Sequence, residues 1–304
     1  MNEIINVVFI FRVLHINLDY KGALKHLRPM VVIFGSIMAI SVYTYLDTIM
    51  LGIIRGDEAV GYYTLSTKTK TILLALINSL STVLLPRLSY YIENKKNAEY
   101  VALLRKAIEF ISVIVIPITV FCILEANAIV RIIGGEGFMP SILCTRILLL
   151  VLIISGYSNI TGIQILLPYG RDKQFTIAVF IGALVDILLN ILLISRYSYI
   201  GAAIATVVAE LAQAIIQTFF ARDKLFGNMN YKTIFKTVLS TAICGGAVVG
   251  IKIAFHNSIL ELFVSFAIYL IGFTILARIL KIGIFIEYFE MIKHKIFPKR
   301  SYIG

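Results

Sequence analysis

The sequence contains few charged residues for its length. Asp, Glu, Lys and Arg account for 15% of the 304 residues, whereas 59% are hydrophobic and the mean hydropathy is +0.92. Soluble globular chains are about half apolar and roughly a quarter charged. Because the apolar residues also form long and numerous runs, the composition excludes a soluble catalytic domain and indicates an integral membrane protein.

Cysteine and histidine are scarce as well, which removes most familiar catalytic and metal sites. The three cysteines lie inside apolar runs, without a spacing that would hold a metal or form a disulfide framework. None of the four histidines has a Ser or Cys partner at a recognisable spacing, and a His-Glu-x-x-His motif is absent. The GGEGF segment at 134–138 follows no strand, so we interpret it as a loop or re-entrant turn. We therefore expect no enzyme activity, no metal and no cofactor.

A signal peptide and a nucleic-acid-binding pattern are also missing. The first residues lack the basic, apolar and small-residue order of a signal peptide, so we expect insertion to rely on the spans themselves. The net charge is +11, but the lysines and arginines collect in short loops between apolar runs. Such residues anchor a protein against anionic lipid headgroups. Membrane lipids are thus expected partners, and nucleic acid is not.

Apolar runs long enough to cross a hydrocarbon core of about 30 Å recur along the chain. They do not alternate as the strands of a membrane barrel do. A shorter run at 4–14 is interpreted as the end of a preceding helix. The sequence predicts an all-α, polytopic transmembrane bundle of about eight helices, at 30–54, 69–91, 107–128, 142–167, 174–195, 199–220, 234–254 and 259–280.

The distribution of lysine and arginine predicts the orientation of this bundle. Of the 28 basic residues, 21 lie at every second boundary between runs and only four at the intervening boundaries. Because basic loops stay on the cytoplasmic side, both termini are predicted to be cytoplasmic.

Polar side chains occur at membrane depth in the first six runs, where ionisable groups usually face a bundle interior or a wet cavity. At 100° per residue, Tyr43 and Asp47 share one face of the first run. Lys68 and Asn78 fall in one stripe of the second run, and Lys70 points to the opposite side. The remaining faces hold Arg146, Tyr157 and Gln164 in the fourth run, Asp186 and Asn190 in the fifth, and Thr206, Glu210, Gln213 and Gln217 in the sixth.

The last two runs carry charges only at their ends. We therefore divide the chain into an N-terminal remnant with a cytoplasmic linker (1–28), a six-helix lobe (29–222), and two peripheral helices with a basic tail (223–304). Polar stripes also hold helices together in proteins that transport nothing. Structural pairing is thus an alternative for Asp186 with Asn190 and for Glu210, and opposite charges among Asp47, Lys68 and Arg146 can pair across the bundle.

Five segments, in their order and spacing, resemble the bacterial polysaccharide flippases, which are the lipid-linked oligosaccharide exporters of the multidrug/oligosaccharidyl-lipid/polysaccharide superfamily. The similarity covers roughly residues 20–225. The segments are YLDTIMLG (45–52), AVGYYTLSTK (59–68), LLPRLSYY (84–91), ILLPYGRDK (165–173) and YIGAAIATVVAE (199–210).

The resemblance implies transport across the bacterial cytoplasmic membrane. Such proteins move a sugar repeat unit, carried on polyprenyl pyrophosphate, to the outer leaflet for capsule, O-antigen or exopolysaccharide synthesis. They usually have two six-helix lobes around a central cavity, with additional C-terminal helices. The six-plus-two pattern matches the second lobe, with Asp47 and Lys68 on its cavity side. The first lobe has no counterpart here, so we expect this chain to need a separate first lobe or a second copy.

Within that cavity, Lys68 and Arg146 are expected to hold the pyrophosphate. Sugar hydroxyls are expected to contact Tyr43, Asn78, Tyr157 and Gln164. Coupling to an ion or proton would use Asp186, Asn190 and Glu210. One alternative is a cation-coupled multidrug antiporter of the same superfamily, with Asp47 among its ion ligands. Another is an integral membrane polysaccharide polymerase, although the predicted outer connections are short for such an enzyme.

Overall fold

A computed structural model of the chain describes residues 45–254 and 258–287. The chain divides into two compact units, Met1–Leu46 and Asp47–Gly304, and the elements described below belong to the second. Most of the first predicted run, including Tyr43, lies outside the described residues, as do the segment at 4–14 and the basic tail. The described part is built from helices without strands, as the apolar runs predict.

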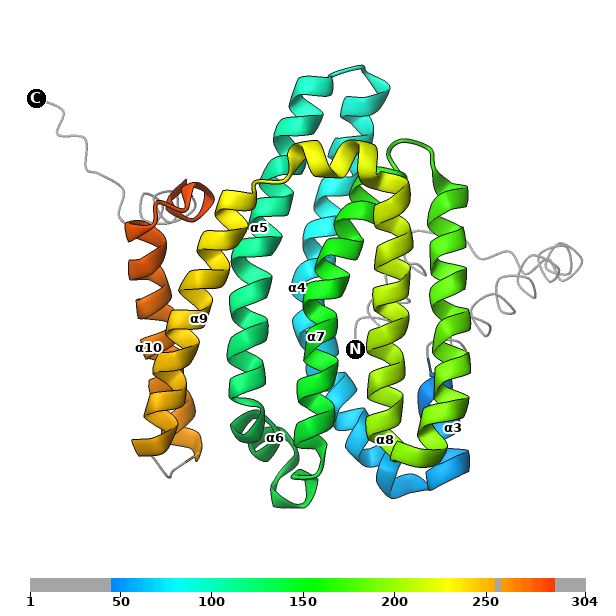
Figure 1. Ribbon diagram of the computed structural model, residues 1–304, viewed down its shortest axis with the longest axis vertical. Coiled ribbons are helices and arrows are strands. Elements are labelled where there is room, and N and C mark those ends of the chain that lie inside the picture. Colours follow the sequence, from blue (N-terminus) through cyan, green and yellow to red (C-terminus); the bar gives the residue numbers. More distant parts are fainter. Residues whose placement is uncertain (1–44, 255–257, 288–304) are drawn as a thin grey trace, which may run out of the picture. The chain divides into compact units, whose positions relative to one another are not determined.

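The helices follow one another through short connections (Figure 1). They are α3 (Leu46–Arg55), α4 (Asp57–Glu93), α5 (Asn97–Leu124), α6 (Ala126–Gly134), α7 (Ser141–Asn159), α8 (Asp172–Leu225), α9 (Tyr231–Ala254) and α10 (Ser258–Ile279). Two 3-10 turns, η1 (Glu136–Phe138) and η3 (Phe226–Asn228), lie in the connections, and α7 continues as a π-helix, η2 (Ile160–Leu166). The GGEGF segment thus forms the end of α6 and a turn, in agreement with its interpretation as a loop.

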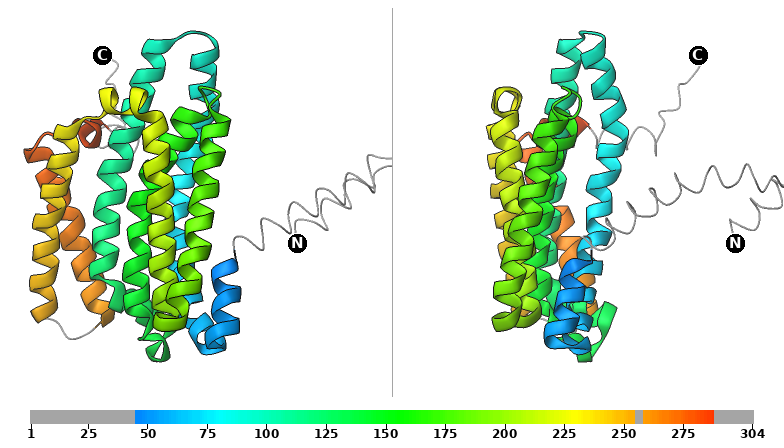
Figure 2. Two further views of the ribbon diagram at one scale, coloured as in Figure 1. Left: turned by 45° about the vertical axis from the view of Figure 1, so that its right-hand side comes forward. Right: turned by 90° about the vertical axis from the view of Figure 1, so that its right-hand side faces the viewer.

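The long element α8 is two antiparallel helices joined at Ser198, whose φ of 52° and ψ of −136° are not helical (Figures 1 and 2). The reversal is tight, because a Cβ at Gly201 would lie 2.3 Å from the backbone oxygen of Leu193. Only glycine fits there. Six helices of the described part are long and apolar enough to cross a membrane, and α8 accounts for two of the predicted runs. Each predicted run from 69–91 onward therefore has its own helix.

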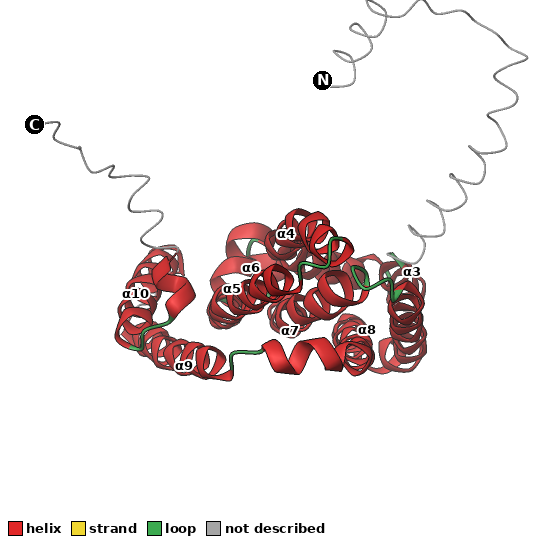
Figure 3. Cartoon of the chain, turned by 90° about the horizontal axis from the view of Figure 1, so that it is seen from above, coloured by secondary structure: helices red, strands yellow, loops and turns green. Residues whose placement is uncertain are grey.

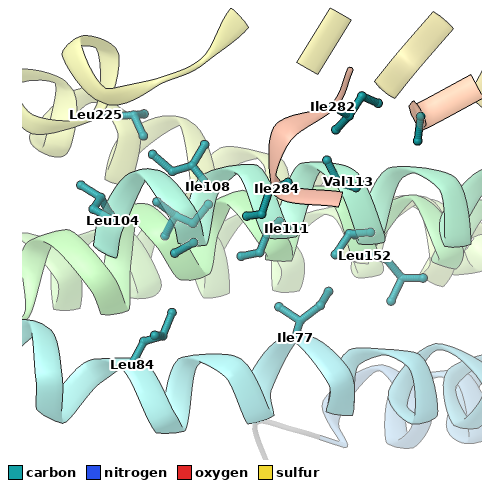
Figure 4. Close-up of a cluster of buried hydrophobic side chains, with 14 of the residues drawn as sticks. Ile77, Leu84, Leu104, Ile108, Ile111, Val113, Leu152, Leu225, Ile282 and Ile284 are labelled. Carbon is teal, nitrogen blue, oxygen red and sulfur yellow. The ribbon is translucent and has the colours of Figure 1, made fainter. Parts of the chain in front are cut away.

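A packed bundle forms around α7, which contacts α4, α5 and α8 (Figure 3). Its core is apolar: Leu104, Ile108 and Ile111 of α5 and Leu152 of α7 are almost fully buried (Figure 4). Since these side chains interdigitate from neighbouring helices, van der Waals packing holds α5 and α7 together.

The last two helices attach to one side of this bundle, where α9 packs on α5 and α10 on α9. An ion cluster joins them. Lys252 of α9 lies 3.3 Å from the carboxylate of Glu125, which is fully buried, and 3.7 Å from that of Glu261 in α10. Lys252 also donates to the backbone oxygen of Leu124. Three helix ends therefore meet at one ammonium group.

Candidate functional site

The Asp47 carboxylate is the centre of a polar cluster between α3, α4 and α8. Tyr63 donates a hydrogen bond to its Oδ2 at 2.7 Å, and Thr206 donates to the same oxygen at 3.1 Å. The Nδ2 of Asn190 donates to Oδ1 at 2.8 Å. Both oxygens of a half-buried carboxylate are thus held in place by groups from two other helices.

Asp186 completes the cluster. It precedes Asn190 by one helical turn, so both side chains share a face of α8, and it lies beside Asp47. Two acceptor oxygens there have no partner, namely Oδ1 of Asp186 and Oδ1 of Asn190, whose side chain is fully buried. We call Asp47, Tyr63, Asp186, Asn190 and Thr206 the Asp47 cluster. An arrangement of two carboxyl groups and neutral oxygens, with two unused acceptors, can bind a proton or a small hard cation.

The second feature is a polar stripe along α4. Lys68, Thr71, Asn78, Ser79 and Thr82 are all exposed on one side of this helix, and we call them the α4 stripe. Ser66, on the other side of α4, contacts Ser141 and Thr145 of α7. The stripe therefore points away from the bundle. The hydroxyl groups of Thr71, Ser79 and Thr82 donate to backbone oxygens of α4 itself, so Lys68 and Asn78 are the side chains of the stripe that would be costly to expose to lipid.

Lys70 has a role that the helical wheel alone did not indicate. The wheel correctly turns it away from Lys68, but that opposite side is the interior of the bundle. There its half-buried ammonium lies within electrostatic range of Asp186 and Glu210. The sequence also does not indicate the contact that Tyr63 makes, because a tyrosine in an apolar run does not reveal its hydrogen-bond partner.

The structure does not bring Arg146 together with Lys68. Arg146 is exposed beside Leu143 and Leu150, on the side of α7 that lies opposite its contact with α4. Tyr157 pairs with the hydroxyl of Ser112 at 2.8 Å. Gln164 is fully buried in η2, whereas Arg146 is exposed. Because η2 is a π-helix, the helical wheel at 100° per residue does not apply to Gln164.

Glu210 lies one helical turn beyond Thr206 and within electrostatic range of Asp186, and Ser155 of α7 donates to its Oε2 at 3.1 Å. With Gln213 and Gln217 it lines a polar pocket between α4, α7, η2 and α8. The stripe expected for the sixth run is therefore an inner surface of the bundle. In the described residues no group of three His, Cys, Asp or Glu side chains could hold a metal ion.

Comparison with known sequences places these features in context. Residues 1–143 match the family of polysaccharide biosynthesis proteins. The chain is 27% identical over 191 residues to a putative O-antigen transporter of Escherichia coli K12, covering 63% of this chain and 46% of the transporter. It is 30% identical over 235 residues to an uncharacterized membrane protein of Methanocaldococcus jannaschii, with 75% and 46% covered. A probable low-salt glycan biosynthesis flippase of Haloferax volcanii is 20% identical over 231 residues, with 73% and 47% covered.

These relatives are about twice as long as the part of them that the chain matches. A solved structure, the lipid II flippase MurJ in an inward closed conformation, has the same fold. It superposes with a TM-score of 0.67 at 20% identity, covering 84% of this chain and 56% of MurJ. Together with the helices of the described part, these similarities support the resemblance drawn from the five segments. The chain is a multi-pass membrane protein related to the polysaccharide flippases of the multidrug/oligosaccharidyl-lipid/polysaccharide exporter superfamily.

Proposed function

We propose that the chain forms one lobe of a transporter that moves oligosaccharides linked to a lipid pyrophosphate across the membrane. The observation that carries this proposal is the α4 stripe, an exposed row of hydroxyl, amide and ammonium groups on a membrane-spanning helix. Sugars and pyrophosphate cannot cross hydrocarbon unassisted, so they need a polar surface of this kind. The names of the O-antigen transporter and the glycan flippase support the same substrate class.

Lys68 is the group on this surface that suits a pyrophosphate. Its ammonium group is exposed at the N-terminal end of the stripe, and it can donate charge-assisted hydrogen bonds to phosphate oxygens. Asn78 and the neighbouring hydroxyl groups suit sugar hydroxyls. Arg146 lies on another face, so we leave it out of this surface.

A partner is part of the proposal, because the α4 stripe needs a cover. Residues 29–222 would form the transporting lobe, and residues 223–304 would attach α9 and α10 beside it. A first lobe, or a second copy of this chain, would close the cavity over the stripe and rock against it to change the side that is open. The length of the relatives supports a first lobe, since the chain matches about half of each.

The Asp47 cluster would couple transport to a cation or proton. Binding there would tie α3 and α4 to both halves of α8, because Asp47 already contacts Tyr63, Asn190 and Thr206. An ion that binds one arrangement of these helices better than the other shifts the equilibrium between them.

The same cluster favours a second candidate function, a cation-coupled multidrug antiporter. Such a protein would exchange a proton or Na⁺ for an organic cation, with the buried carboxyl groups as its ion ligands. One exposed lysine on the α4 stripe argues against this alternative, because it would repel a cationic substrate.

Complementation of a strain that lacks its polysaccharide flippase tests the proposal. We expect no surface polysaccharide from the chain alone, and restored polysaccharide when a first lobe from a full-length relative is expressed with it. Rescue by the chain alone would instead identify a second copy as the cover. If no combination restores surface polysaccharide at normal membrane abundance, and the protein exports cationic dyes instead, the antiporter becomes the supported function and the flippase is rejected.

A further inference from the structure

A polar pocket of about 270 Å³ opens between neighbouring helices of the bundle. Its walls come from α4, α7, η2 and α8, and the side chains that matter below are Asn78, Ser158, Phe175, Glu210, Gln213 and Gln217. We call it the amide pocket. The mechanism proposed above does not use it, although Asn78 belongs both to this pocket and to the α4 stripe.

The backbone at Gly162 allows the pocket to form. A Cβ there would lie 2.8 Å from the ring of Phe175 and 3.0 Å from the amide of Gln217. Glycine in η2 therefore lets an aromatic ring and a buried amide approach the same helix. The Oε1 of Gln217 accepts hydrogen bonds from Ser158 at 2.7 Å and from Thr161 at 3.1 Å, and its Nε2 has no acceptor.

The charge of the pocket indicates a neutral ligand. Glu210 is the one charged residue among the described residues that line it, so a pyrophosphate would be repelled. Lys70, which does not line the pocket, lies within electrostatic range of Glu210 and offsets its charge. What remains is a set of amide and hydroxyl groups that both donate and accept hydrogen bonds.

An aromatic ring completes this set. Phe175 lines the pocket together with Asn78 and Gln213, and pockets for small ligands combine such apolar walls with a few placed polar groups. A pyranose ring has the matching chemistry, with hydroxyl groups around its edge and an apolar face of C–H groups. The volume suits one such ring.

We propose that the amide pocket binds one sugar unit of the transported oligosaccharide. This inference rests on the proposed function and names the part of the substrate that the lobe recognises. Lys68 and Asn78 are ten residues apart on α4, or about 15 Å along the helix axis. That distance exceeds one sugar ring, so the bound unit is one further along the oligosaccharide than the sugar attached to the pyrophosphate.

Tryptophan fluorescence tests the pocket directly, because the chain contains no tryptophan. Phe175→Trp places a reporter in the pocket, and Phe180→Trp places one on the same helix at a site that is 68% exposed. Each variant of the full chain is held in lipid nanodiscs and titrated with glucose, galactose and N-acetylglucosamine. We expect a saturable change of emission from the residue at 175 with at least one sugar and none from the residue at 180.

Gln213→Leu on the Phe175→Trp background provides the second measurement. Gln213 makes one long hydrogen bond of 3.4 Å to Ser158, so its loss leaves the fold intact, which size-exclusion chromatography checks. Removing one amide that binds the sugar should weaken the affinity about tenfold. The inference is overturned if no sugar changes the emission, if both reporters respond alike, if Gln213→Leu has no effect, or if sodium pyrophosphate binds in place of sugars. If the chain binds sugar but restores no surface polysaccharide even together with a first lobe from a full-length relative, the result counts against the proposed function alone.

Discussion

Lys68 and Lys70 are two residues apart on α4, and their surroundings give them different tasks. Lys68 is exposed on the α4 stripe, whereas Lys70 is half-buried near Asp186 and Glu210. A cation that faces a cavity is available to a substrate. A cation that faces buried carboxylates balances their charge. Under the proposed function, the same residue type would serve recognition on one side of the helix and charge compensation on the other.

Lys68→Ala should reduce transport strongly in the assembled transporter. Losing a group that holds a phosphate costs about 2 kcal/mol, which corresponds to a decrease of more than tenfold. The control is Lys173→Ala, at an exposed lysine near the start of α8, which should leave transport unchanged. Surface polysaccharide is quantified at equal membrane abundance of both variants. Equal transport in the two variants would show that Lys68 does not bind the substrate.

Asp47→Asn should uncouple transport from its driving ion. The amide keeps the shape of the carboxylate and can still accept from Tyr63 and Thr206, but it removes a negative charge from the Asp47 cluster. In proteoliposomes, Na⁺ and pH gradients are imposed separately, and the gradient that drives the wild-type protein should lose its effect. Asp172→Asn, at an exposed site, is the control. If transport by the Asp47→Asn variant still responds to the gradient, the cluster has a structural role and does not couple transport to the ion.

Among the elements, the ion cluster at Lys252 is the clearest link between the bundle and the last two helices. Lys252→Ala should lower the free energy of unfolding by about 3 kcal/mol, because it leaves the fully buried Glu125 without its partner. Glu125→Gln combined with Lys252→Ala should recover part of this loss, since no buried charge remains. Thermal unfolding in detergent measures both. A double variant as unstable as the sum of the single ones would show that the two groups do not interact.

Hydropathy sufficed to locate the helices, because only a helix satisfies its own backbone in lipid. The same signal cannot separate an α-helix from the π-helix at Ile160–Leu166, since both appear as one apolar run. The helical wheel therefore does not hold for Gln164, whereas Lys68 and Asn78 of α4 are both exposed, as their shared stripe predicts. The Asp47 cluster was predictable only in part. Asp47, Asp186 and Asn190 are visible as polar residues in apolar runs, but Thr206 reaches the same carboxylate only through the reversal of α8 at Ser198.

Three of the five segments that carry the resemblance meet in that cluster. YLDTIMLG contributes Asp47, AVGYYTLSTK contributes Tyr63, and YIGAAIATVVAE contributes Thr206. The last of these segments also contains Gly201, on which the reversal of α8 depends. The segments that carry the resemblance therefore include residues that hold α3, α4 and α8 at one carboxylate.

At the scale of the whole molecule, the distribution of charge, and not the fold, determines the orientation in the membrane. The helices would fit a bilayer either way up, but the loop at 94–96, between α4 and α5, contains Lys95 and Lys96. The opposite end of α4 begins at the acidic pair Asp57 and Glu58. Basic loops remain in the cytoplasm, so the 94–96 loop is predicted to be inside and position 57 outside.

Single introduced cysteines measure this orientation, because Cys122, Cys144 and Cys244 are all buried and react poorly. Asp57→Cys should be labelled in intact cells by a thiol reagent that does not cross membranes. Lys96→Cys should be labelled only after the cells are opened, which also proves that the thiol is accessible. The α4 stripe runs between these two points, with Lys68 nearer to position 57. The predicted orientation would thus put Lys68 toward the outer leaflet and the mouth of the amide pocket deeper in the membrane. Labelling of position 96 but not 57 in intact cells would reverse the orientation, and Lys68 would then meet the pyrophosphate near the cytoplasm.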